Sequence, residues 1–143
     1  MKIVKNKSHK EFGDVIYVSD DKKIFATQEE CEEYEDELLQ KRMDDFEKRC
    51  GVRYLPFDGE LERDFMLVNL QNKTDLDDLI DFLEIVVSVQ DTTWLMAKKP
   101  NKYPTAQVVA YNLTDCFFAG AARKWLKELQ SSVEIIKEFL KEE

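Results

Sequence analysis

The chain has 143 residues and a net charge of −9, and 43% of its residues are hydrophobic and 36% are charged. This composition is typical of a highly charged globular protein rather than a disordered one, and the length suits a single domain, residues 1–143. The negative charge argues against direct binding to nucleic acid or to an anionic membrane. The sequence has no apolar run close to the roughly 20 residues that a membrane span needs.

The first elements predicted are a β-hairpin and a helix. Residues 15–18 and 24–25 favour strands, and the polar residues 19–23 between them favour a turn. Before this hairpin we expect only a basic, polar tail that contains His9. Thr27 begins a capping-box pattern that predicts a helix start, and Gly51 predicts its end. The apolar residues of this helix recur every three to five positions: Cys31, Tyr34, Leu38, Met43, Phe46 and Cys50.

A loop, a strand and a second helix follow. Residues 52–64, with Pro56 and Gly59, predict a loop, and residues 65–70 are apolar on nearly both sides, which predicts a central strand of a sheet. Thr74 is the expected cap of the second helix. The residues expected to bury one side of that helix are Leu76, Leu79, Ile80, Leu83 and Val86.

The C-terminal part predicts two more strands and a long helix. Residues 94–97 and 108–111 favour strands, separated by a basic loop. The last helix is expected to begin at Thr114 or Asp115. Its apolar stripe is Phe118, Ala122, Trp125, Leu129, Val133, Ile136 and Leu140. The predicted fold is therefore α+β, in the order ββαβαββα, with a small, mostly antiparallel sheet packed by three helices.

Catalytic and metal-binding patterns are missing from the sequence. His9 is the single histidine, which excludes a multi-histidine metal site, and the four glycines form no phosphate-binding loop motif. The three cysteines, expected on helix faces, form no CxxC and predict core thiols in a reducing cytoplasm. We therefore expect a binding protein that is not an enzyme and has no metal or cofactor.

Charges are segregated along the chain. Residues 27–50 contain ten acids and four bases, whereas residues 98–127 contain six bases and one acid. The bases are Lys98, Lys99, Lys102, Arg123, Lys124 and Lys127. With aromatic residues such as Tyr103 and Phe118 they could hold a phosphate and stack on a base. Alternatively, they only solvate a helix and balance the acids elsewhere.

The segment DKKIFATQEECEEYE, residues 21–35, resembles a hairpin–helix start, D-G-K-x-F-x-T-x-E-E-C-x-x-Y-E, that recurs in small phage proteins, with Lys22 in the place of the usual glycine. The resemblance implies a phage counter-defence protein in the cytoplasm of a bacterial host. Two classes fit. The first is the Thoeris anti-defence family, which holds a cyclic ADP-ribose signal between protomers without turnover.

By that resemblance the protein is a homo-oligomer whose ligand contacts include Arg123, Lys127 and Phe82. Lys99, Lys102, Tyr103 and Phe118 complete the predicted binding site. The second class is that of acidic anti-CRISPR proteins, which block the nucleic-acid channel of a Cas effector. The two acidic helices suit this alternative, in which the partner is a basic host defence protein.

Overall fold

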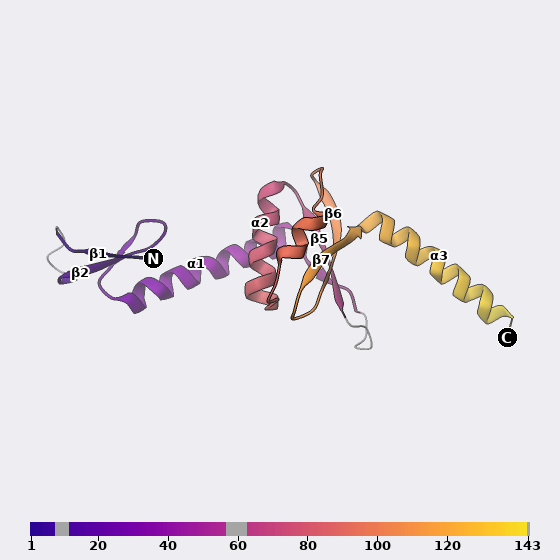
Figure 1. Ribbon diagram of the computed structural model, residues 1–143, viewed down its shortest axis with the longest axis horizontal. Coiled ribbons are helices and arrows are strands. Elements are labelled where there is room, and N and C mark those ends of the chain that lie inside the picture. The colour runs from indigo at the N-terminus through magenta and orange to yellow at the C-terminus, as the bar shows by residue number, and fades with distance from the viewer. Residues whose placement is uncertain (8–11, 57–62, 143) are drawn as a thin grey trace. The chain divides into compact units, whose positions relative to one another are not determined.

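The computed structural model describes residues 1–7, 12–56 and 63–142 (Figure 1). These residues form an α+β fold with three α-helices and two small antiparallel sheets, in agreement with the predicted fold class. The chain divides into two compact units, Met1–Asp45 and Phe46–Glu143. The predicted position of His9 and the predicted loop around Gly59 lie outside the described residues.

The first unit contains a three-stranded antiparallel sheet in the order β1-β2-β3. The predicted hairpin is confirmed as β2 and β3. The prediction of a polar tail before it is wrong, because β1 lies there and pairs with β2 along its whole length. The strand bounds are β1 Lys2–Lys5, β2 Val15–Val18 and β3 Ile24–Phe25.

The turn between β2 and β3 is held by Ser19. The hydroxyl of Ser19 accepts a hydrogen bond from the amide of Lys23 at 3.0 Å, and the Ser19 carbonyl accepts one from the amide of Lys22 at 2.9 Å. Lys22 has a φ of 70°, in the left-handed region that favours glycine. The backbone of Lys22 therefore has a conformation that glycine adopts at lower cost than lysine.

Helix α1, Gln28–Arg49, begins where the sequence predicts. The Thr27 hydroxyl accepts a hydrogen bond from the amide of Glu30 at 3.2 Å and so satisfies one free amide of the first turn. On the buried side of the helix, Cys31, Met43 and Phe46 are at most 2% exposed. The residues of α1 from Phe46 onward belong to the second unit.

The second unit contains a four-stranded antiparallel sheet in the order β4-β5-β6-β7. The strand predicted at residues 65–70 is β5, and its central position is confirmed. Short strand β4 lies in the segment predicted as a loop. The strand bounds are β4 Arg53–Tyr54, β5 Asp64–Leu70, β6 Thr105–Tyr111 and β7 Cys116–Ala121.

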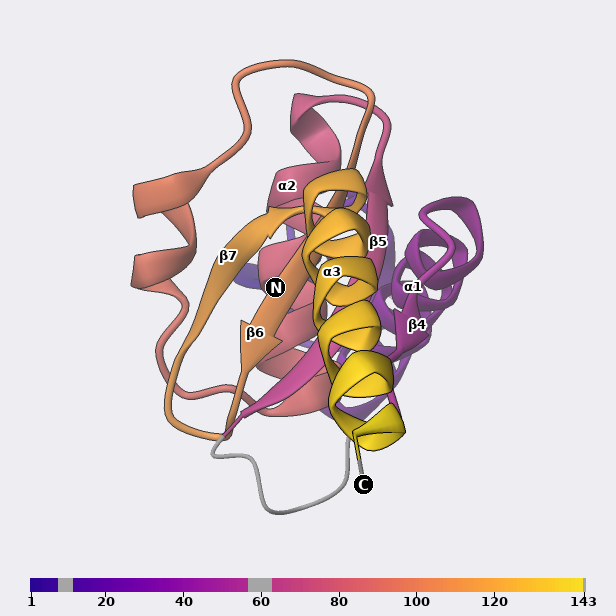
Figure 2. The ribbon, with the colours of Figure 1, turned by 90° about the vertical axis from the view of Figure 1, so that its right-hand side faces the viewer.

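Helix α2, Lys73–Phe82, begins at a different cap from the predicted one. Asn72 is the N-cap, and it forms a reciprocal capping box with Asp75, so the prediction of Thr74 as the cap is wrong by two residues. A π-helical turn, η2, continues the helix over Leu83–Val87. In Figure 2 α2 lies behind the sheet of β5, β6 and β7. The largest side chains of the core of this unit are Phe46, Met66, Val68, Leu70, Leu79, Phe82, Leu83, Leu95, Val108, Val109 and Phe118.

The strand predicted at residues 94–97 is instead part of a 3-10 helix, η3, Thr93–Lys98. The carboxylate of Asp91 accepts hydrogen bonds from the amide of Thr93 at 2.9 Å and from its hydroxyl at 2.6 Å, which favours a tight turn at this point. The amide of Leu95 then donates to the Thr92 carbonyl at 3.1 Å. The second hairpin is formed by β6 and β7.

Helix α3, Ala122–Lys141, begins later than predicted. Thr114 and Asp115, where the helix is expected to begin, precede β7, and residues 116–121, predicted as the first turns of the helix, form that strand and pair with β6. Gly120 has a φ of 140°, which a helix does not contain. Cys116 therefore lies on a strand, and not on the helix face that the sequence predicts.

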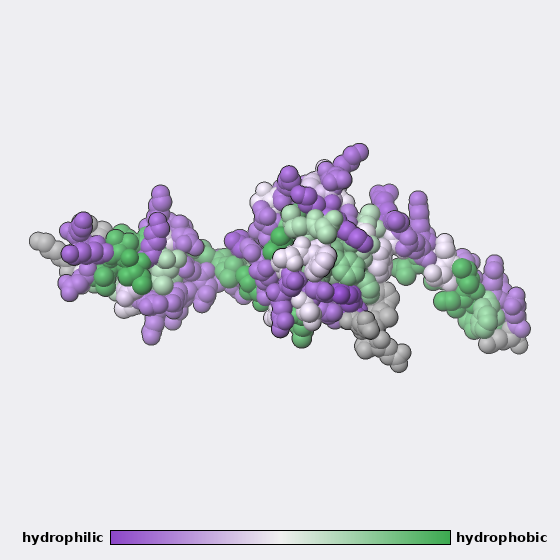
Figure 3. Space-filling view, viewed as in Figure 1, coloured by the Kyte–Doolittle hydropathy of each residue, from purple (hydrophilic) through white to green (hydrophobic). Residues whose placement is uncertain are grey.

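The side chains of α3 lie largely outside the core. None of its residues is buried, although it contacts β6 and β7, and the ring of Trp125 lies 4.9 Å from that of Phe65. Apolar side chains form a visible patch along its second half (Figure 3). None of the helices in the described part of the chain combines the length and the apolar composition needed to cross a bilayer.

Candidate functional site

A hollow of about 300 Å³ lies on the second unit beside the first residue of α3. Strands β4, β5 and β6 form one part of its lining, and the start of α3 forms the other. Small side chains leave the space open, and Arg53 and Asn69 supply polar groups. The lining residues are Gly51, Arg53, Leu67, Val68, Asn69, Ala106 and Ala122.

The strand register brings these residues together. Arg53 lies opposite Leu67, and Asn69 lies opposite Ala106. Because side chains alternate between the faces of a strand, Leu67 and Asn69 point away from the side of the buried residues of β5. One register step further, Gln107 lies opposite Ala121, which places the first turn of α3 at the same end of the sheet.

The helix terminus makes one end of the hollow electropositive. The N-cap of α3 is Ala121, and within the described residues no side-chain cap hydrogen bond forms at this helix start. The positive end of the helix dipole lies at this point, and the first turn carries Arg123 and Lys124 but no acid. Together with Arg53, these groups favour an anion, and phosphate is one of the anions that helix N-termini bind.

The cationic residues of the predicted site are exposed. Arg123 lies in the first turn of α3 beside the hollow, and Lys127 lies one turn further along the helix. Lys99 and Lys102 are on the loop that leads to β6, and the half-buried Tyr103 lies on the same loop, two residues before that strand begins at Thr105. Since Thr105 pairs with Leu70, this loop ends near the end of β5. None of the predicted cations, Arg123 and Lys127 included, and not Tyr103 either, is among the residues that line the hollow, which α3 reaches through Ala122.

The two predicted phenylalanines are in the core. Phe82 is 1% exposed and its ring lies 5.4 Å from that of Phe46, and Phe118 is also 1% exposed. In this conformation neither offers a surface to a ligand. An apolar aromatic side chain fits both a core and a stacking platform, and only its burial in the folded chain distinguishes the two.

Arg53 and Asn69 were not among the predicted site residues. Arg53 is far from the basic cluster in the sequence, and it reaches the hollow because β4 pairs with β5.

A second cation that was not predicted is Arg63, which lies in a separate cluster. Its guanidinium lies 4.9 Å from the centre of the Phe117 ring, and the ammonium of Lys98 lies 5.9 Å from the same centre. Arg63 also forms an ion pair with Asp115, so the positive charge of this cluster is partly neutralised by a carboxylate of the same cluster. The position of either arginine could have been predicted only from knowledge of which strands pair and in which register.

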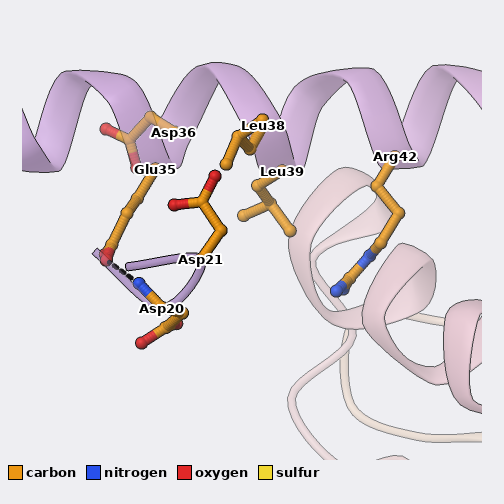
Figure 4. Close-up of a pocket in the computed structure, with 7 residues that line it drawn as sticks. All are labelled: Asp20, Asp21, Glu35, Asp36, Leu38, Leu39 and Arg42. Carbon is orange, nitrogen blue, oxygen red and sulfur yellow. Dashed lines mark hydrogen bonds between the residues drawn. The ribbon is translucent and has the colours of Figure 1, made fainter. Parts of the chain in front are cut away.

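The first unit has a cavity of about 370 Å³ between the hairpin turn and α1 (Figure 4). The amide of Asp20 donates a hydrogen bond to Glu35 at 3.2 Å, and Asp21 accepts hydrogen bonds from the hydroxyls of Ser19 and Tyr34. These hydroxyls lower the pKa of Asp21. The cavity is lined by Asp20, Asp21, Glu35, Asp36, Leu38, Leu39 and Arg42. The carboxylates of Asp21 and Glu35 therefore join the hairpin turn to α1.

The cysteines are poor candidates for nucleophiles. All three are free and buried. Burial raises the pKa of the Cys50 thiol and that of the Cys116 thiol to about 11, and it also raises the pKa of Cys31. Within the described residues, no three histidine, cysteine, aspartate or glutamate side chains gather in a way that could hold a metal ion.

Comparison of the chain with models of protein families, with curated proteins and with solved structures finds no match.

Proposed function

We propose that this protein acts by binding rather than by catalysis, and that it holds a phosphate-bearing, nucleotide-derived signal at the hollow beside α3. The observation that carries the proposal is the meeting of Arg53 with the uncapped, basic first turn of α3 at a hollow with small side chains. By the resemblance of residues 21–35, the signal is a cyclic ADP-ribose isomer and the setting is phage counter-defence in the host cytoplasm.

The chemistry of the hollow supports an anionic ligand. The amides at the start of α3 can donate to phosphate oxygens, and the guanidinium groups of Arg53 and Arg123 can neutralise their charge. A volume of about 300 Å³ is at the small end of the range for ligand pockets. It suits a pyrophosphate with part of a ribose, and the remainder of the ligand would extend toward the loop of Lys102 and Tyr103.

The proposal is tested by thermal unfolding in the presence of each cyclic ADP-ribose isomer, with linear ADP-ribose as a comparison. A ligand at 100 times its Kd adds about 2.7 kcal/mol to the free energy of unfolding, which raises the Tm by roughly 10 °C for a chain of this size. Mass spectrometry of the recovered ligand should show it unchanged, because we expect sequestration without turnover.

Two charge reversals locate the site. Arg53→Glu and Arg123→Glu should each abolish the rise in Tm, whereas Lys2→Glu, at an exposed position on β1 of the first unit, makes the same change of charge and should leave the rise intact. Unchanged Tm with every isomer at millimolar concentration would overturn the proposal. Binding that survives Arg53→Glu would place the ligand elsewhere.

The acidic side of α1 favours a second candidate function, inhibition of a basic host defence protein such as a Cas effector. Glu29, Glu30, Glu32 and Glu33 are all exposed in the first turns of α1. A patch of carboxylates can compete with nucleic acid for a basic channel. This candidate predicts a salt-sensitive complex that co-elutes with the effector. It also predicts that changing these four glutamates to glutamine abolishes co-elution, whereas changing Glu128 and Glu138, which are exposed on α3, to glutamine does not.

A further inference from the structure

Helix α3 displays an apolar stripe with a regular heptad spacing. Apolar residues recur at alternating intervals of four and three from Ala122 to Leu140, which is a mean period of 3.5 residues. Such a period keeps one seam facing a partner helix, as in a coiled coil. The seam consists of Ala122, Leu126, Leu129, Val133, Ile136 and Leu140.

This seam is open to solvent in a single chain. Its five large residues, Leu126 to Leu140, are 42–56% exposed, and Phe139 beside it is 63% exposed. Helices in proteins owe most of their stability to the packing of an apolar face, and isolated helices are marginal in water. A helix of 20 residues without a single buried side chain therefore needs a partner for its seam.

We propose that α3 pairs with α3 of a second copy of this chain, in an antiparallel coiled coil centred near Ser131. The seam positions are of two kinds that alternate along the helix. In the antiparallel pair, each residue at one kind of position packs against a residue at the other kind in the second copy. Leu129 packs against Val133 of the second copy, Leu126 against Ile136, and the small Ala122 against Leu140. The six seam residues of each helix are then all used.

The charge of the whole chain favours a second copy over a membrane as the occupant. Within Ala122–Lys141 there are five bases and three acids, so α3 has a net charge of +2 while the whole chain has −9. The negative charge of the whole chain outweighs the +2 of α3 and opposes attraction to anionic lipids, on which interfacial helices rely.

The same charges favour the antiparallel direction. The rest of each chain carries −11 and joins α3 at its first residue, so two parallel helices would bring these charges together. In the antiparallel pair the joining points are separated by the length of the helix, about 30 Å, which exceeds the screening length of about 8 Å at physiological salt.

One like-charge contact makes the direction testable. In the antiparallel pair Arg123 lies beside Lys137 of the second copy, on the flank of the seam. In a parallel pair Lys137 would lie beside Ser132 instead. The repulsion is weak because both groups are exposed. The seam covers one face of one helix, which is small compared with a standard interface of about 800 Å² per partner. We therefore expect a reversible dimer.

Sedimentation equilibrium of the full chain over micromolar to submillimolar concentrations tests the pairing. The mass should rise with concentration toward twice that of the monomer. Leu129→Glu, in the centre of the seam, should give a monomer at every concentration, whereas Ser131→Glu adds the same charge on the opposite side of α3 and should leave the dimer intact. Both positions are exposed, so the cooperative unfolding of the remaining chain should be unchanged and serves as the control for folding.

Monomers at every concentration, or a dimer that Leu129→Glu does not weaken, would overturn the pairing. Monomers that bind lipid vesicles through α3 would overturn it in favour of a membrane. For the direction, Lys137→Glu should tighten the dimer several-fold, and Ser132→Cys should form a disulfide between copies on mild oxidation. No effect of Lys137→Glu, or an efficient disulfide with Leu140→Cys, would overturn the antiparallel direction. None of these experiments requires the nucleotide ligand, so their outcome is independent of the proposed function.

Discussion

Arg49, the last residue of α1, forms an ion pair with Asp75 in the first turn of α2. Asp75 is 1% exposed, and its carboxylate also accepts hydrogen bonds from the amides of Gln71 at 2.7 Å and Asn72 at 3.3 Å. Burial acts to raise the pKa of Asp75, but the guanidinium and the two amides outweigh it and hold this pKa below its ordinary value. The buried charge is thus fully partnered.

Replacing Asp75 by asparagine should lower the free energy of unfolding by about 2–4 kcal/mol, because the amide cannot pair with Arg49 as a charge and satisfies fewer donors. Since the pKa of Asp75 is lower in the folded state, its contribution is present above pH 4 to 5 and is lost as the pH falls through the folded pKa. Urea unfolding at pH 7 and at pH 3 should therefore show a smaller difference between the Asp75→Asn variant and the original protein at pH 3.

The matched control is Asp77→Asn, which removes an exposed carboxylate from the same helix. It should change stability by less than about 0.5 kcal/mol at either pH. If Asp75→Asn is equally harmless, the ion pair contributes nothing to the stability of the fold.

The tilted ring contact of Phe46 with Phe82 joins α1 to α2 in the core of the second unit. Both rings are at most 1% exposed. Phe46→Ala should cost about 3–5 kcal/mol, since it removes a large buried side chain and leaves a cavity. Leu113→Ala, at a position that is 68% exposed, should be nearly neutral. Denaturant midpoints measure both, and similar midpoints would mean that the core collapses around the cavity.

Two glycines have positive φ values, and their backbone conformations differ in whether another residue type can adopt them. Gly51 has a φ of 57°, which asparagine adopts readily, whereas Gly120 has a φ of 140°, which non-glycine residues rarely adopt. A Cβ at either position would have ordinary contacts, at 3.8 Å from its nearest neighbour, so the backbone decides the outcome. We expect Gly51→Asn to cost less than about 1 kcal/mol and Gly120→Asn about 1–3 kcal/mol. Equal Tm values for the two variants would contradict this difference.

The buried thiols should be unreactive in the folded protein. Because the pKa of Cys50 and that of Cys116 are raised to about 11, the reactive thiolate is scarce at pH 7.5, and burial also denies access to reagents. A disulfide reagent should therefore label no thiol rapidly in the native state and all three in guanidinium chloride. Rapid labelling of one thiol before unfolding would identify a site that opens locally.

The start of the chain was predictable because its signals are local. Thr27 caps α1, and the polar residues between 15–18 and 24–25 form a turn, as their own chemistry favours. Residues 94–97 were mispredicted because four apolar residues do not distinguish a strand from a short helix. Only the hydrogen bonds of Asp91 with Thr93 fix the tight helical geometry.

Residues 116–121 were mispredicted for a different reason. Phe118 has the helical spacing to Ala122 and Trp125, but the backbone of β7 pairs with β6, and a distant strand leaves no trace in such a local pattern. The candidate site was predictable only in part for the same reason. Arg123 followed from its basic neighbours in sequence, whereas Arg53 reaches the hollow through strand pairing.

The contact of Trp125 with Phe65 gives the protein a built-in optical probe. Trp125 is partly shielded at the root of α3, while the second indole, that of Trp94, is 60% exposed on η3. Acrylamide should quench the fluorescence of Trp94 first, so the residual emission comes mainly from Trp125. Its intensity and wavelength then report, without any attached dye, whether α3 stays seated on the sheet.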